Sequence, residues 1–153
     1  MAQPQRPRVA VIGLDCAAPD LEFDRLISEL PTLRALSGHG LLGCLETVIP
    51  PITVPAWASM MTGRDPGTLG VYGFRNCRDH SRSGLTTVTS APVREPAVWY
   101  LLSTEARPSI VVGVPPSYPC KPLVGCAVSC FLTPSDHAEA GLDTTQCSPA
   151  VAL

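Results

Sequence analysis

The chain has 153 residues, the length of one ordinary domain, and its 45% hydrophobic and 16% charged residues exclude an intrinsically disordered protein. Its 11 basic and 13 acidic side chains give a formal net charge of −2, without the basic stripe that a nucleic-acid-binding domain carries. The composition therefore predicts a globular α/β chain that binds no nucleic acid.

Seven cysteines at irregular spacing, with no Cys-x-x-Cys pair, predict neither a disulfide framework nor a structural zinc ribbon. We expect reduced thiols. The apolar run at residues 9–14 is shorter than the core of an export signal, and no stretch approaches the ~18 apolar residues of a membrane helix. The sequence predicts a cytoplasmic protein without a membrane partner and leaves the oligomeric state open.

The predicted elements alternate between strand and helix along most of the chain. After a polar arm at 1–7, the expected strands are 8–14, 41–49, 85–90, 109–114 and 123–131, and the expected helices are 20–30, a short stretch around 33–36, 55–62 and 95–106, with a polar loop at 76–84. Alternation of this kind predicts crossover units and a mostly parallel sheet. Residues 8–135 are the predicted domain, and the tail at 136–153 does not continue the pattern.

Asp15 follows the first predicted strand, at the end where open α/β sheets bind their ligands. A carboxylate at that point can hold a divalent metal or orient a ribose. It can equally cap the following loop, and the residues alone leave these interpretations open.

Thr53 lies between the second predicted strand and a helix with proline in its first turn. Backbone N–H groups and the positive dipole end of a helix favour phosphate there, so a hydroxyl at this place is a candidate nucleophile. Threonine is also a common N-cap, and capping is the simpler interpretation from spacing alone.

Other motifs of phosphate and acyl chemistry are absent from the sequence. It has no Walker-type loop, no Gly-x-Gly-x-x-Gly after the first strand and no Gly-x-Ser-x-Gly elbow. His39, His80 and His137 are scattered among predicted loops. The adjacent Asp136 and His137 lie in the polar tail, where we expect them to be solvated rather than bound to a metal.

Several blocks keep one order along the chain, among them Ile-Pro-Pro-Ile-Thr-Val-Pro-Ala-Trp at 49–57 and Met-Thr-Gly-Arg-Asp-Pro-Gly at 61–67. The others are 11–15, 33–36, 70–74, 98–99, 101–102, 112–115, 118–119 and 131–135. Together these blocks resemble the type I phosphodiesterase/nucleotide pyrophosphatase family of the alkaline phosphatase superfamily.

The resemblance implies an alkaline-phosphatase-like three-layer α/β sandwich with a mostly parallel sheet, incomplete at the C-terminus of this chain. It also implies a two-metal phosphoesterase, usually with zinc, that acts on a phosphate ester or nucleotide. Asp15 falls on the family's first metal ligand, and Thr53 on the nucleophile that contacts the same metal. The metal would activate the Thr53 hydroxyl, and water would hydrolyse the covalent phosphothreonine that forms.

The sequence also departs from the family pattern. Ala56 stands where eukaryotic relatives carry Asn, Cys16 where the family usually has Gly, and Leu69 where many relatives have His. Family members run to several hundred residues, and their remaining Asp and His ligands lie in a later half. We therefore expect a truncated or frameshifted chain with one partial metal site and a tail out of family register.

The resemblance and these departures leave two functions open. The first is a metal-dependent phosphoric ester hydrolase with Thr53 as its nucleophile. The alternative is a catalytically incompetent fragment or a weak phosphate- or metal-binding module. A sulfatase is disfavoured because Thr-Val-Pro-Ala-Trp at 53–57 lacks the Cys/Ser-x-Pro-x-Arg context of that class.

Overall fold

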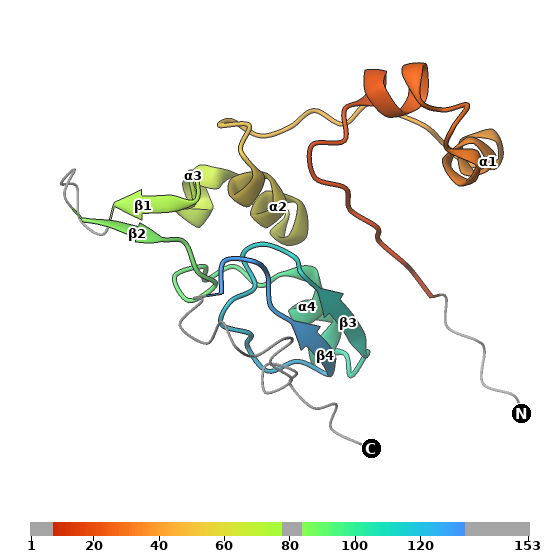
Figure 1. Ribbon diagram of the computed structural model, residues 1–153. Coiled ribbons are helices and arrows are strands. Elements are labelled where there is room, and N and C mark those ends of the chain that lie inside the picture. Colours follow the sequence, from red (N-terminus) through yellow and green to blue (C-terminus); the bar gives the residue numbers. More distant parts are fainter. Residues whose placement is uncertain (1–7, 78–83, 134–153) are drawn as a thin grey trace, which may run out of the picture. The chain divides into compact units, whose positions relative to one another are not determined.

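The structure is a computed structural model that describes residues 8–77 and 84–133. By its internal contacts the chain divides into two units, Met1–Glu46 and Thr47–Leu153, and each is described by itself (Figure 1). The predicted arm at 1–7, the predicted tail at 136–153, His80 and His137 lie outside the described residues.

Two short helical segments lie in the first unit, within residues 8–46. A π-helix spans Asp20–Arg25, with the N–H of Leu26 donating to the carbonyl of Leu21 at 2.9 Å. Helix α1 spans Pro31–His39. The helix predicted over 20–30 is therefore shorter than expected, and Pro31 begins the next helix, where its missing N–H costs nothing.

The strands predicted at 8–14 and 41–49 are not formed, and this prediction was wrong for the described structure. Both segments are irregular, and most of their aliphatic side chains are exposed, with Ile12 at 85%. A strand is stabilised by a hydrogen-bonded neighbour. The described part of the first unit contains no strand, so neither segment has a strand there to pair with.

The described part of the second unit contains three helices. Helix α2 spans Thr53–Thr62, α3 spans Pro66–Leu69 and α4 spans Val98–Thr104. These bounds confirm the helices predicted at 55–62 and 95–106, with α2 longer by two residues and α4 shorter at both ends. Gly63 ends α2 in the left-handed conformation, at φ 68°, which glycine adopts without steric cost.

The strands described in the second unit form two separate pairs (Figure 1). Strand β1, Arg75–Cys77, pairs antiparallel with β2, Leu85–Thr87. The loop predicted at 76–84 is therefore wrong at residues 76–77, which belong to β1. Strand β3, Ser109–Val112, pairs in parallel with β4, Gly125–Val128. The strands predicted at 85–90, 109–114 and 123–131 are thus confirmed in shortened form, whereas the complete three-layer sandwich remains a prediction.

Two hydrophobic clusters form the core of the second unit. One places α2 against α3 and the segment after β2; its buried residues are Val54, Ala58, Leu69, Val71, Val88 and Val93. The other packs α4 against β3 and β4 and contains Ala97, Trp99, Val111, Leu123 and Ala127. Fully burying one valine stabilises the fold by about 1.5–3 kcal/mol, so the first cluster holds the start of α2 in place.

Candidate functional site

Thr53 is the first residue of α2 and is half-buried. The residue before it, Ile52, has extended backbone angles of φ −123° and ψ 146° and occupies the N-cap position. The simpler interpretation of Thr53, that it is the N-cap, is therefore wrong in this structure. Thr53 instead begins the helix, where the positive end of the helix dipole acts on its side chain.

The first turn of α2 has few backbone donors to offer an anion. The N–H of Ile52 donates to the carbonyl of Pro50 at 2.9 Å, and the N–H of Ala56 donates to the carbonyl of Ile52 at 3.0 Å. Pro55 has no N–H. The first turn of α2 therefore has fewer backbone donors than the first turn of a helix without proline at this position.

Two polar contacts follow the C-terminal end of α2, one at Arg64 and one at Asp65. The Arg64 side chain forms an ion pair with Glu95, with 3.0 Å between Nε and Oε2. Asp65 caps α3, accepting hydrogen bonds from the Thr68 N–H at 3.0 Å and the Thr68 hydroxyl at 2.6 Å. Both hydrogen bonds lower the pKa of Asp65 below its ordinary value of 3.8, and the bond from the Thr68 hydroxyl has the larger effect. Arg64 and Glu95 are 31 positions apart in the sequence, so no local sequence pattern predicts that they pair.

Asp15 lies in an exposed turn of the first unit, whereas Thr53 belongs to the second. The turn replaces the strand end at which the sequence placed Asp15. Its neighbour Cys16 has φ 59°, a left-handed conformation that glycine adopts more easily than other residues. The family resemblance places glycine at this position, and glycine would adopt the observed angle without the steric cost that Cys16 bears.

The described residues do not form a metal centre on their own. Across 8–77 and 84–133, no group of three or more His, Cys, Asp or Glu side chains is placed to hold a metal ion. A closed site needs three or four convergent protein ligands. The described residues therefore do not supply a complete set of metal ligands.

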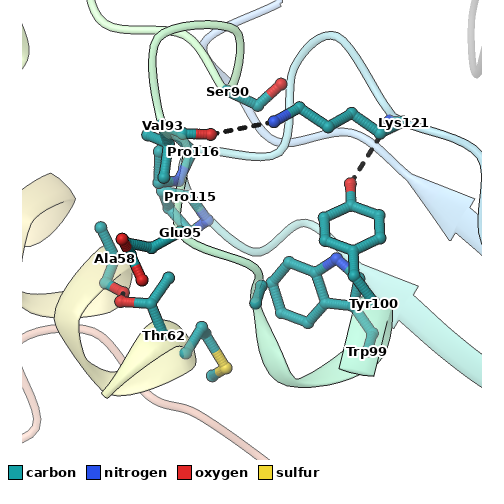
Figure 2. Close-up of a pocket in the computed structure, with 12 residues that line it drawn as sticks. Ala58, Thr62, Ser90, Val93, Glu95, Trp99, Tyr100, Pro115, Pro116 and Lys121 are labelled. Carbon is teal, nitrogen blue, oxygen red and sulfur yellow. Dashed lines mark hydrogen bonds between the residues drawn. The ribbon is translucent and has the colours of Figure 1, made fainter. Parts of the chain in front are cut away.

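A small pocket of about 30 Å³ lies among α2, α4 and the loops around them (Figure 2). Lys121, the only lysine of the chain, donates from Nζ to the carbonyl of Val93 at 3.0 Å. Its backbone N–H donates to the Tyr100 hydroxyl at 3.3 Å. The volume holds one or two water molecules, far less than the ~300 Å³ or more of a ligand pocket. No sequence pattern predicts this pocket, and its volume of about 30 Å³ is too small to hold a phosphate ester.

No helix among the described residues is long and apolar enough to cross a membrane. No curated protein and no solved structure gives a significant match to the chain.

A family model, by contrast, matches residues 9–146, which include Asp15, Thr53 and the turn at Gly63. Its description is type I phosphodiesterase / nucleotide pyrophosphatase. Members are phosphodiesterase- or pyrophosphatase-like hydrolases of phosphate esters or nucleotides, and they generally bind divalent metals. Because the match spans most of the sequence, this chain belongs to the type I phosphodiesterase / nucleotide pyrophosphatase family.

Proposed function

We propose that the chain is a metal-dependent phosphoric ester hydrolase in which the Thr53 hydroxyl is the nucleophile. One observation carries the proposal: Thr53 is the first residue of a helix anchored in the core, within the segment that matches the family model. The positive end of the helix dipole favours negative charge on a phosphoryl group at this end.

The proposed reaction has two balanced steps. In the first, the Oγ of Thr53 forms a bond to phosphorus as the ester bond to the leaving group breaks, and the departing alcohol takes up the proton lost by the hydroxyl. In the second, water attacks the phosphothreonine, the bond from phosphorus to Thr53 breaks, and the hydroxyl regains a proton. Splitting the hydrolysis in this way is the general advantage of covalent catalysis.

Asp15 is the proposed carboxylate ligand of a divalent metal, with Thr53 as a second ligand. When bound, such a metal supplies Lewis-acid stabilisation of negative charge. Asp15 is exposed, and the described residues do not supply a closed coordination shell, so no step of the reaction is assigned to the metal.

The test is hydrolysis of bis-p-nitrophenyl phosphate by the 153-residue chain with added zinc, with excess chelator and with the Thr53→Ala variant. We expect turnover that the chelator removes and that Thr53→Ala lowers about a thousandfold or more, the scale of losing a nucleophile. Thr53→Ser, which keeps a hydroxyl, is the matched control and should retain part of the activity. Turnover that survives Thr53→Ala would exclude Thr53 as the nucleophile.

The second candidate is a phosphate-binding module that does not turn over its ligand. The observation that favours it is the absence of a three-ligand metal group within the described ranges 8–77 and 84–133. It predicts binding of inorganic phosphate by the purified chain, weakened by Thr53→Ala, with no hydrolysis at any zinc concentration. Zinc-dependent turnover would exclude it.

A further inference from the structure

Residues 8–14 form an apolar segment that the turn at Asp15 and Cys16 ends. Its four large aliphatic side chains are between 60% and 85% exposed: Val9, Val11, Ile12 and Leu14. Within the part of the chain that the structure describes, the backbone of this segment forms no hydrogen bond. The segment therefore presents apolar side chains together with unpaired backbone groups, as an unprotected strand edge does.

The composition of the segment favours a strand. Valine and isoleucine are enriched in strands, and residues 9–14 contain no charge and no proline. The segment lacks only a neighbour with which it can exchange backbone hydrogen bonds. The same segment of a second copy of the chain supplies such a neighbour, and pairing of identical surfaces about a twofold axis gives a closed dimer.

The charges at the two ends of the segment decide the direction of pairing. Arg8 begins it, and Asp15 follows its last apolar residue. Antiparallel pairing places Arg8 of each copy opposite Asp15 of the other, whereas parallel pairing in register places like charges next to each other. Asp15 already has an interaction within its own chain, and its two carboxylate oxygens can accept several hydrogen bonds. Charge complementarity therefore selects the antiparallel arrangement.

The same register gives every large aliphatic side chain an apolar neighbour. With Arg8 opposite Asp15, Val9 faces Leu14 of the other copy and Val11 faces Ile12. At roughly 60–120 Å² for each aliphatic side chain, the two copies together bury about 500–1,000 Å² of apolar surface. This area is at the low end of specific interfaces and is typical of a transient dimer.

We propose that residues 8–15 form a weak homodimer by antiparallel β-pairing with the same segment of a second copy. The proposal goes beyond the hydrolytic function and does not depend on it, because Thr53 and a bound metal take no part in the pairing. Association depends on concentration, so the segment stays irregular and exposed in the monomer.

The test is analytical ultracentrifugation of the full chain, with reductant because Cys16 is an exposed thiol and with excess chelator to keep metal from Asp15. Between about 1 and 500 µM we expect a monomer–dimer equilibrium with a Kd of about 10–100 µM, as for a small transient interface. Arg8→Glu and Asp15→Arg should each raise the Kd about three- to tenfold, because each places like charges opposite one another. The double variant reverses both charges and should restore the Kd to within about twofold of the parent value.

Val11→Lys and Leu45→Lys are the matched pair, because both replace an exposed aliphatic side chain in an irregular segment. Val11→Lys brings two like charges together near the centre of the strand pair and should raise the Kd about tenfold or more. Leu45→Lys should leave it unchanged. Circular dichroism checks that each variant keeps the fold of the parent chain.

Four results would overturn the proposal. The parent chain could stay monomeric up to the highest concentration measured, or it could form open-ended aggregates instead of a dimer. The double charge variant could fail to restore association. Finally, Leu45→Lys could weaken association as much as Val11→Lys does, which would indicate unspecific contact between apolar segments.

Discussion

The protonation of a single residue, Asp65 in the turn after α2, makes the stability of the fold depend on pH. Its carboxylate accepts two hydrogen bonds from Thr68, which lower its pKa below 3.8. A carboxyl group with a lowered pKa in the folded state stabilises the fold above its unfolded-state pKa. That contribution disappears as the pH falls through the folded-state value.

We therefore expect Asp65→Asn to flatten the acid side of the stability curve. Asparagine can still cap α3 but does not titrate, so the variant should lose less stability than the parent chain between about pH 6 and about pH 3. Urea unfolding across this range measures the difference. Thr68→Val, which removes only the hydroxyl donor, should give an intermediate slope. Identical slopes in all three proteins would show that this cap does not couple folding to pH.

The pairing of β3 with β4 depends on close approach at Gly125. This residue has φ 129°, and a Cβ added there would collide with the carbonyl oxygen of Ser109 and lie 2.7 Å from its nitrogen. The two residues are register partners in the parallel pair. A side chain at position 125 would therefore push apart the strands that bury Val111 and Ala127.

Gly125→Ala should accordingly lower the free energy of unfolding by about 2–4 kcal/mol, combining overpacking with an unfavourable backbone conformation. Gly63→Ala is the matched control, because Gly63 has φ 68° but an added Cβ would meet nothing within 4 Å. It should cost only about 1–2 kcal/mol. Equal losses in urea unfolding for the two variants would contradict the close contact with Ser109.

At the scale of the whole molecule, sequence patterns predicted helices better than strands. Thr53 was predicted to precede a helix and begins it, because Pro55 and the cluster around Val54 define α2 locally. The strand at 8–14 was predicted from apolar content, yet a strand also needs a neighbour that no local pattern specifies. The pairing of Arg64 with Glu95 was missed for the same reason, since it joins distant positions.

This difference between the segments gives a prediction for backbone amide exchange. Residues 8–14 and 41–49 are irregular and exposed, whereas β3 and β4 form a hydrogen-bonded pair over a buried cluster. Exposed amides exchange through local fluctuations whose free energy is close to zero. Amides in a packed strand pair exchange only when a larger part of the fold opens. Hydrogen exchange followed by mass spectrometry should therefore label both irregular segments at the earliest time point and label 109–112 and 125–128 much later. Slow exchange at 8–14 would contradict the irregular structure and favour the buried strand that its apolar residues predict.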